Sequence, residues 1–253
     1  MSTKFVKFQD IAAVQLNGIV TKNKEKEIVM INNTEAITNI NKKSKSIIVF
    51  EKIVKRFIDI LAGIFGIILL IPFTVGIYIA NRLVKDKGPI FYSQKRIGKD
   101  GKIFKMYKYR SMVVGADEKL EKYLKENKEA REEYKKYKKL KNDPRITKVG
   151  KILRKTSLDE LPQFINLLKG EMSLIGPRPY LQREKEEMGQ YYNIIVKCTP
   201  GLSGLWQTEG RSSLTFQDRL DLDIIYYKEK SLMNDYKILI KTIKKVIGKE
   251  GAL

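Results

Sequence analysis

The sequence of 253 residues contains no histidine and a single cysteine. Without histidine the commonest general base is absent, so acid–base or nucleophilic chemistry must fall to other side chains. A single cysteine, Cys198, excludes an intrachain disulfide and a cysteine-rich zinc site, and it fits a reducing compartment. We interpret Cys198 as a packing residue rather than a nucleophile. The first 20 residues also lack the charged start, apolar centre and cleavage site of a signal peptide.

Acidic residues are few relative to basic ones. The chain has 50 Lys and Arg residues against 29 Asp and Glu residues, which gives a formal charge of +21. This excess predicts anionic partners such as nucleic acid, anionic lipid or phosphorylated substrates. The length predicts one globular domain plus appendages, with enough residues to bury a core.

One apolar segment, residues 60–80, contains no charged residue. As a straight helix it would be about 30 Å long, enough to cross a bilayer. Both of its flanks are basic, and Lys and Arg favour the cytoplasmic side, so both ends are assigned to that side. Pro72 lies inside the segment and would bend a helix there. We predict a re-entrant membrane helix over residues 46–87, bent at Pro72; a single-pass anchor is the alternative.

The regions on either side of this segment differ in character. Residues 1–45 are polar and rich in lysine and asparagine, and we predict a weakly structured extension there. Residues 89–110 predict a β-hairpin, because two strand-like runs flank a turn signal at residues 99–101. Residues 88–253 as a whole are predicted to form a cytoplasmic catalytic domain.

Three further segments predict helices: residues 117–141, 161–168 and 235–247. The first is highly charged and either solvated or in contact with lipid headgroups. The last places lysines opposite an apolar face, which suits an anionic membrane surface or packing on the protein's own core. The predicted fold class is α+β and predominantly helical. It combines a re-entrant membrane helix, interfacial amphipathic helices and a small β-hairpin around the active site.

Two adjacent carboxylates, Asp159 and Glu160, lie in a basic part of the sequence. The simplest interpretation is a capping box, in which Ser157 caps a helix and Glu160 reaches back to its amide. The other interpretation is chemical. A helix N-terminus and nearby Arg154 favour ionised carboxylates, so that Asp159 becomes an anion able to attack phosphorus or to hold Mg²⁺.

Several arginines are candidates for binding phosphate. Arg178 lies between two prolines, which hold its guanidinium on a stiff backbone suited to bidentate contacts. Arg110, Arg145 and Arg211 lie in turn-like or loop-like surroundings and are further candidates. We rank Arg154 and Arg178 above them, because an arginine elsewhere is more often a solvated surface charge.

Several blocks of the sequence resemble the bacterial sugar transferase family, the monotopic polyprenyl-phosphate phosphoglycosyl transferases. The blocks are residues 55–59 (KRFID), 88–98 (GPIFYSQKRIG), 105–112 (KMYKYRSM), 142–145 (NDPR), 154–162 (RKTSLDELP), 172–179 (MSLIGPRP) and 200–207 (PGLSGLWQ). Their joint order over about residues 50–248 makes the resemblance specific. The chain departs from the family at Ile71, where a serine often precedes the proline. It looks like the short catalytic form, without a multi-span N-terminal region.

The resemblance implies that Asp159 is a nucleophile and that Glu160 is its partner at a Mg²⁺ site. It also implies transfer of a sugar-1-phosphate from a UDP-sugar to polyprenyl (undecaprenyl) phosphate, with release of UMP and a phosphosugar-aspartyl intermediate. Such a reaction would initiate polysaccharide or glycan assembly on the cytoplasmic face of a bacterial membrane.

The expected partners are therefore a UDP-sugar, polyprenyl phosphate and the lipid bilayer, with a homo-oligomer left open. Nucleic acid is not expected, because aromatic residues are not interleaved with a basic platform. Two alternatives stay open: a membrane-associated glycosyltransferase that releases UDP, and a non-enzymatic, basic, membrane-anchored binding protein.

Overall fold

The apolar segment forms one continuous helix, α3 (Lys45–Leu83), which includes Pro72. The computed structural model describes residues 45–210 and 214–248, and residues 49–253 form one unit. Almost all of the predicted N-terminal extension thus lies outside the described residues. Within the described part, α3 is the one helix that is long and apolar enough to cross a membrane. The bend at Pro72 remains a prediction.

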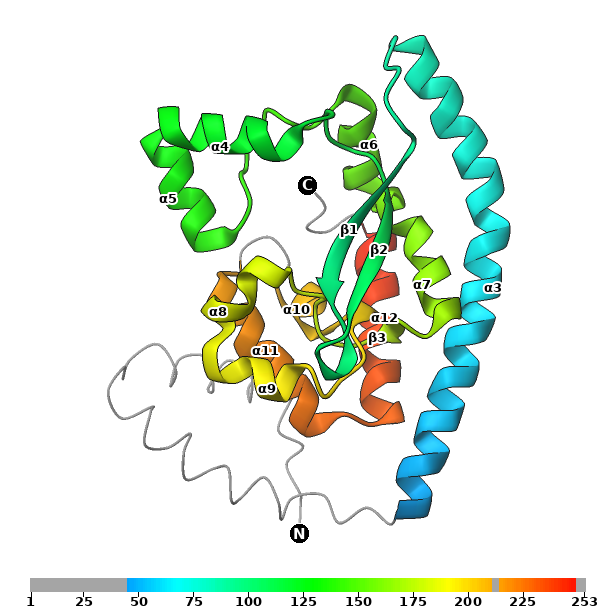
Figure 1. The fold of residues 1–253 in the computed structure, drawn as a ribbon. Coiled ribbons are helices and arrows are strands. Elements are labelled where there is room, and N and C mark those ends of the chain that lie inside the picture. Colours follow the sequence, from blue (N-terminus) through cyan, green and yellow to red (C-terminus); the bar gives the residue numbers. More distant parts are fainter. Residues whose placement is uncertain (1–44, 211–213, 249–253) are drawn as a thin grey trace. The chain divides into compact units, whose positions relative to one another are not determined.

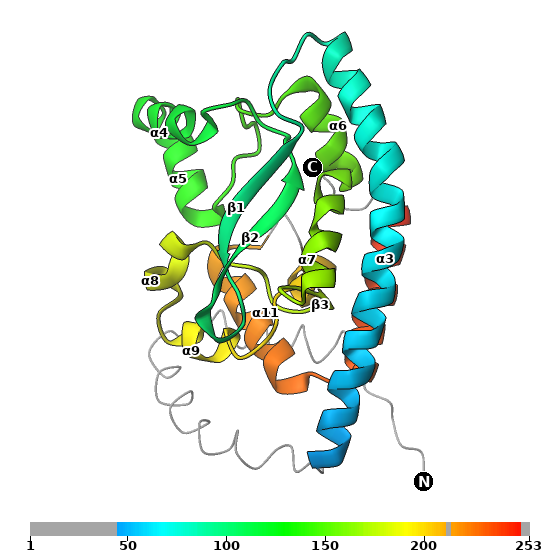
Figure 2. The same ribbon diagram turned by 45° about the vertical axis from the view of Figure 1, so that its right-hand side comes forward.

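One side of α3 packs against the rest of this unit along most of the helix (Figures 1 and 2). A Cβ added at Gly63 would lie 2.5 Å from the side chain of Leu168, and one at Gly66 would lie 2.1 Å from that of Phe164. These two glycines therefore let α3 approach α7 (Phe164–Lys169) closely. Further along α3, Ile77 is buried.

The other side of α3 carries exposed apolar side chains. They include Phe57, Leu61, Ile64, Phe65, Ile68, Ile71 and Val75. So many exposed large apolar side chains on one helix are unusual in a water-soluble protein and are typical of a surface that contacts lipid.

A β-hairpin follows α3, as predicted. Strands β1 (Phe91–Ile97) and β2 (Ile103–Tyr109) are antiparallel, with Phe91 opposite Tyr109 and Ile97 opposite Ile103. The turn between them is the short 3₁₀ helix η1 (Lys99–Gly101), in which Asp100 and Gly101 have positive φ. The turn signal at these residues is therefore confirmed.

The remaining elements surround this hairpin. Before the second sheet they are α4 (Ala116–Glu126), α5 (Lys128–Tyr137), α6 (Lys148–Thr156), η2 (Leu158–Gln163) and α7. The second sheet pairs β3 (Ser173–Ile175) in parallel with β4 (Gly201–Ser203). Between these strands lie η3 (Gln182–Glu184), α8 (Lys185–Met188), η4 (Gly189–Tyr191) and α9 (Tyr192–Ile195). After them come α10 (Leu205–Glu209), α11 (Phe216–Glu229) and α12 (Leu232–Ile247). The described part is mostly helical, with two small sheets.

The single helix predicted over residues 117–141 is wrong, because the chain breaks it into α4 and α5 at Asn127. This residue has an extended backbone, and its side chain accepts a hydrogen bond from the amide of Ala130 at 2.9 Å. Asparagine competes for backbone groups inside helices and favours the N-cap position, which explains the break. The two helices instead pack on each other around Leu120 and Ala130.

The other two predicted helices are confirmed. The segment at 161–168 is covered by η2 and α7, and it ends at Gly170, which has a φ of 75°. Helix α12 begins after Ser231, whose hydroxyl accepts a hydrogen bond from the amide of Asn234. Ile238 on one side of α12 is buried. Other apolar side chains of the same helix are exposed: Met233, Tyr236 and Ile243. The helix thus packs on the core and also presents an apolar surface.

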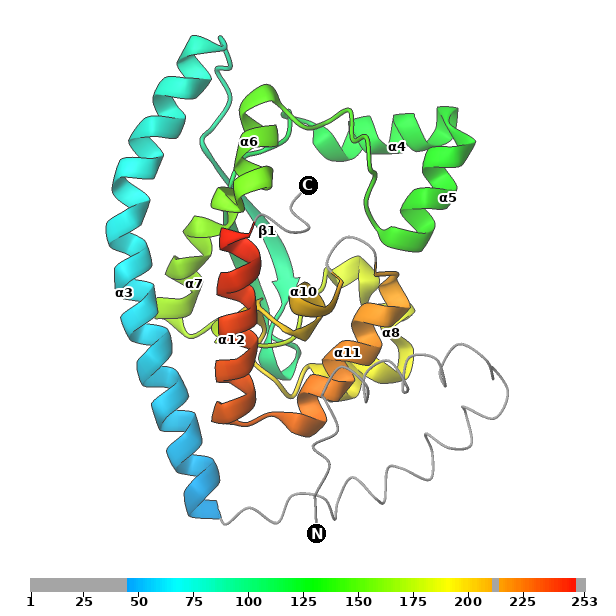
Figure 3. The ribbon, with the colours of Figure 1, turned by 180° about the vertical axis from the view of Figure 1, so that it is seen from behind.

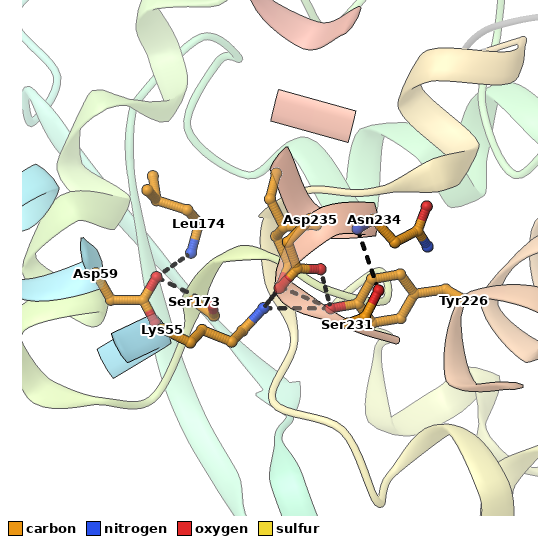
Figure 4. A network of polar contacts seen from close by, with 9 residues as sticks. Lys55, Asp59, Ser173, Leu174, Tyr226, Ser231, Asn234 and Asp235 are labelled. Atoms are coloured by element: carbon orange, nitrogen blue, oxygen red, sulfur yellow. Dashed lines mark hydrogen bonds and ion pairs between the residues drawn. The ribbon is translucent and has the colours of Figure 1, made fainter. Parts of the chain in front are cut away.

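Two charged side chains of α3 hold strand β3 in place (Figure 4). Asp59 accepts hydrogen bonds from the hydroxyl of Ser173 at 3.0 Å and from the amide of Leu174 at 2.8 Å. Lys55 donates to the carbonyl of Ile175 at 2.7 Å and forms an ion pair with Asp235 of α12. We call these contacts the β3 clamp. It connects α3, β3 and α12, and Figure 3 shows α12 next to α3.

Removal of the Asp59 carboxylate should destabilise the fold. In Asp59→Ala the hydroxyl of Ser173 and the amide of Leu174 lose their acceptor inside the protein. We expect the free energy of unfolding to fall by about 2–4 kcal/mol, and by less in Asp59→Asn, which keeps an oxygen. Thermal unfolding in detergent micelles measures this. Glu229→Ala, at an exposed acid on α11, is the control; an equal effect in both variants would contradict the clamp.

Candidate functional site

The Asp159-Glu160 pair lies in η2, immediately after α6. The capping-box prediction for this pair is wrong. Ser157 ends α6 in a left-handed conformation, with a φ of 57°, and its side chain makes no capping hydrogen bond. The chain therefore enters a 3₁₀ turn instead of starting an α-helix from an extended N-cap residue. The carboxylate of Glu160 accepts a hydrogen bond from Lys108 of β2 at 2.9 Å, which directs it toward the hairpin.

Asp159 is a buried carboxylate between charged neighbours, with 8% of its surface exposed. Burial raises its pKa to about 6, and the adjacent Glu160 also raises it, while Lys108 and Arg154 lower it. The charged form is thus kept out of water and is stabilised by two cations rather than by solvent. At neutral pH most of the carboxylate is ionised, which suits a nucleophile or a metal ligand.

Arg154 is positioned on α6, close to Asp159. Its Nε donates a hydrogen bond to the hydroxyl of Ser111 at 2.9 Å. Burial lowers the pKa of this guanidinium, and the charges of Asp159 and Asp143 oppose that effect. The structure therefore brings Arg154 and Asp159 together, as the sequence predicted.

A cavity of 70 Å³ connects Glu160 to Arg178 and Pro179. Lys108, Glu160 and Arg178 all line it, so side chains from β2, η2 and the loop after β3 meet here. The guanidinium carbon of Arg178 lies 5.3 Å from the centre of the Trp206 ring. Its backbone amide donates to Asp223 at 3.1 Å, which fixes the backbone of this segment. Arg178 is thus in the same pocket as Glu160.

The other predicted arginines are used differently. Arg110 donates to the carbonyls of Pro89 and Met112 and to the carboxylate of Asp86. Arg145 forms a bidentate pair with Asp143, at 2.8 and 2.6 Å. Both guanidinium groups are therefore committed to holding loops. Arg211 lies outside the described residues.

Three residues that line the pocket were not predicted from the sequence as site residues: Lys108, Arg96 and Trp206. Met106 and Lys108 are two positions apart on β2 and both line the cavity, as side chains on one face of a strand do. Strand periodicity was thus a usable signal for Lys108. No comparable local signal marks Arg96 or Trp206.

Asp159 and Glu160 are the candidate ligands for a divalent cation. Over residues 45–210 and 214–248, no group of three or more acidic or cysteine side chains gathers in one place. Mg²⁺ is often held by one or two carboxylates together with the phosphates of a substrate. The hard oxygen donors of Asp159 and Glu160 fit that kind of site, with the remaining ligands supplied by substrate and water.

A family model described as bacterial sugar transferase matches residues 50–249 of the chain. Curated relatives include an undecaprenyl-phosphate galactose phosphotransferase of Salmonella typhimurium, which is 44% identical over 80% of this chain and 42% of the relative. A UDP-glucose:undecaprenyl-phosphate glucose-1-phosphate transferase of Escherichia coli is 36% identical over 76% of this chain and 40% of its own length.

A shorter relative is the exopolysaccharide production protein ExoY of Sinorhizobium fredii. It is 41% identical over 78% of this chain and 87% of the relative. The chain therefore spans about two fifths of the length of the longer relatives and most of the length of this one. All three matches agree with the family resemblance that the sequence blocks carry.

The raised pKa of Asp159 predicts a stability change that depends on pH. The folded state favours the protonated carboxyl, so its stabilising contribution is complete below pH 3.8 and is lost as pH rises through about 6. Asp159→Asn avoids this loss. We expect this variant to be more stable than the wild type at pH 7.5, by up to about 3 kcal/mol, and to lose that advantage near pH 4.

Chemical denaturation at the two pH values measures the difference. Asp117→Asn, at an exposed carboxylate on α4, is the control and should not change the pH dependence. A variant Asp159→Asn that is less stable than the wild type at pH 7.5 would contradict the desolvation of this carboxylate.

Proposed function

The chain belongs to the bacterial sugar transferase family, and we propose that it transfers a sugar-1-phosphate from a UDP-sugar to polyprenyl phosphate and releases UMP. The product would begin the assembly of a polysaccharide or glycan. The names of the relatives from Salmonella typhimurium and Escherichia coli support this reaction class. The observation that carries the proposal is the buried carboxylate of Asp159, with its pKa near 6, beside a pocket lined by cations.

The diphosphate of the UDP-sugar would bind next to Asp159, among the cationic side chains that surround it. Lys108 and Arg178 line the cavity, and Arg154 is close enough to Asp159 to lower its pKa. Their charges would neutralise the diphosphate and hold the sugar-bearing phosphorus next to the carboxylate. Phosphoryl transfer depends mainly on such positioning and charge neutralisation, which explains why a chain without histidine can perform it.

The reaction would proceed in two displacements at phosphorus. A carboxylate oxygen of Asp159 attacks the phosphorus that carries the sugar, the bond from that phosphorus to the bridging oxygen breaks, and UMP leaves. A phosphate oxygen of the lipid then attacks the same phosphorus, and the bond to Asp159 breaks. The carboxylate is regenerated and a polyprenyl diphosphate sugar is released. Such covalent catalysis predicts ping-pong kinetics.

Asp159 and Glu160 would also hold Mg²⁺ together with the substrate diphosphate. The ion would supply further neutralisation of phosphate charge when it is bound. Lys108 already pairs with Glu160 at 2.9 Å, so this lysine keeps the second carboxylate oriented toward the cavity.

The lipid substrate would approach from the side of α3 and α12. Exposed apolar side chains of both helices offer a surface for the bilayer, among them Phe65 of α3 and Tyr236 of α12. The catalytic domain makes polar contacts with α3 on both sides of Pro72, at Asp59 and at Thr74, whose hydroxyl lies 2.6 Å from that of Tyr109. This arrangement supports a monotopic, re-entrant helix whose two ends lie on the cytoplasmic side of the membrane, with the active site.

The role of Asp159 is tested by its substitution. We expect Asp159→Asn to lower the rate of UMP release from a UDP-sugar by about 10³-fold or more, because the amide cannot act as the nucleophile. In the wild type the rate should rise with pH through about 6, as the carboxylate ionises. Asp117→Asn, at an exposed position, should remain active. Release of UDP in place of UMP would instead indicate a glycosyltransferase.

The topology is tested by cysteine labelling. Lys52 and Lys87 lie on either side of the apolar segment, and both are exposed, whereas Cys198 is buried. We expect Lys52→Cys and Lys87→Cys to react with a membrane-impermeant maleimide in inside-out vesicles and to be protected in right-side-out vesicles. Labelling of the two positions from opposite sides would contradict the re-entrant helix and favour a single-pass anchor.

A further inference from the structure

The turn of α3 that contains Pro72 has two features that favour a bend. Proline has no N–H to donate, which removes the helical hydrogen bond to the carbonyl of Ile68. In the same part of the helix, the hydroxyl of Thr74 donates a hydrogen bond to the carbonyl of Leu70 at 2.7 Å. A threonine that bonds in this way to the fourth residue before it often bends a helix. Both features act within residues 68–74.

Tyr109 of β2 reaches this turn from the catalytic domain. Its hydroxyl lies 2.6 Å from the hydroxyl of Thr74 and 3.1 Å from the carbonyl of Leu70. Only 1% of the surface of Tyr109 is exposed, so water does not compete for these contacts. A buried tyrosine hydroxyl needs hydrogen-bond partners, and the two partners of this one both belong to α3. We call these three oxygens, from Leu70, Thr74 and Tyr109, the hydroxyl tie.

The ring of Tyr109 belongs to a hydrophobic cluster that also reaches the acidic pair. Ile77 of α3 is part of this cluster, and Leu158 and Leu161 of η2 pack against it. These two leucines lie immediately before Asp159 and immediately after Glu160 in the sequence. The ring of Tyr109 thus takes part in the packing that supports η2, while its hydroxyl contacts α3.

The neighbouring residue on β2 faces the site. Successive side chains of a strand point to opposite faces, and Lys108 lines the cavity and donates a hydrogen bond to Glu160 at 2.9 Å. Strand β2 is therefore in contact with α3 through Tyr109 and with the acidic pair through Lys108. A displacement of β2 along α3 would displace the acidic pair by a similar amount.

We propose that Tyr109 is a positioning residue whose hydroxyl fixes the depth of the active site relative to α3, and thereby relative to the phosphate of the lipid substrate. This rests on the proposed function, in which one substrate is soluble and the other lies in the bilayer. In the second displacement the lipid phosphate must reach the phosphorus held on Asp159. The exposed apolar side of α3 sets the depth of the protein in the bilayer, so the hydroxyl tie converts that depth into the height of Asp159. The first displacement uses a soluble donor and does not depend on it.

Tyr109→Phe separates the two roles, because it keeps the ring in the cluster and removes the hydroxyl. The experiment uses the full chain in proteoliposomes, with undecaprenyl phosphate and a UDP-sugar that the wild type turns over. We expect kcat/KM for undecaprenyl phosphate to fall about five- to tenfold, the effect of one lost hydrogen bond. The burst of UMP released in a single turnover without the lipid should change less than twofold. A general loss of structure would lower both quantities.

Two further variants test the contact itself. Thr74→Val removes the other hydroxyl of the tie and should lower kcat/KM for the lipid by a similar factor. The double variant should be no worse than about tenfold, because the two hydroxyls act as one unit. Tyr107→Phe is the matched control. It removes a hydroxyl from the same face of β2, but the partner of that hydroxyl is Lys169 of α7 at 3.0 Å, so both steps should change less than twofold.

The position of α3 is measured directly by pulsed EPR. Lys52→Cys and Leu83→Cys place spin labels at exposed positions on either side of Pro72, whereas Cys198 is buried. On a straight helix these positions are about 47 Å apart. We expect one narrow distance distribution in the wild type and in Tyr107→Phe, and a broader one in Tyr109→Phe, because α3 then bends without its partner in the hairpin.

Several results would overturn the proposal. If the wild type gives the UMP burst but Tyr109→Phe matches Tyr107→Phe in the lipid step and in the EPR distances, the tie does not position the site and the proposed function stands. If Tyr109→Phe lowers the burst as strongly as the lipid step, the hydroxyl supports only the general fold. If the wild type gives no UMP burst with any UDP-sugar, the proposed covalent mechanism is wrong, and the positioning role falls with it.

Discussion

The β3 clamp is the contact on which the geometry of the site depends. Asp59 and Lys55 hold strand β3 from the side of α3, and the chain leaves β3 through Gly176 into Pro177-Arg178-Pro179. On the far side of that segment the buried carboxylate of Asp223 holds the amide of Arg178. Arg178 is therefore fixed between α3 and α11, and its position cannot be separated from that of α3.

The site itself combines groups that are each unfavourable for folding. Asp159 is a carboxylate removed from water, and Arg96, Arg178 and Arg219 are cations that repel one another in a buried region. Such an arrangement persists only because the surrounding fold is stable, and under the proposed function a phosphorylated ligand would balance its charge. The proposed function thus accounts for the buried carboxylate and the close guanidinium groups, which do not stabilise the fold.

Much of the local structure could be predicted from the sequence. The hairpin, α7 and α12 follow from turn signals, a glycine stop and apolar periodicity, and the acidic pair was found from its basic surroundings. The errors have local causes. Asn127 prefers to cap a helix rather than to continue one, and Ser157 adopts a left-handed conformation that no pattern required.

The long-range contacts could not be predicted from the sequence, for a different reason. Arg110 and Arg145 look like phosphate ligands in the sequence, but their guanidinium groups are occupied by carbonyls and carboxylates that only the fold brings near. Arg96 and Trp206 meet in one cavity although 110 positions separate them in the chain. Pairing over such distances leaves no periodic signal in either segment.

The clamp also bears on how the protein is made. Asp59 and its partner Ser173 are 114 positions apart, and ribosomes add about 5–20 residues per second, so roughly 6–23 s pass between their syntheses. During that interval, under the proposed membrane association, the bilayer would be the available partner of the exposed apolar side of α3. The catalytic domain would then fold onto a helix that is already embedded, so that the membrane acts as a template for the assembly of the enzyme.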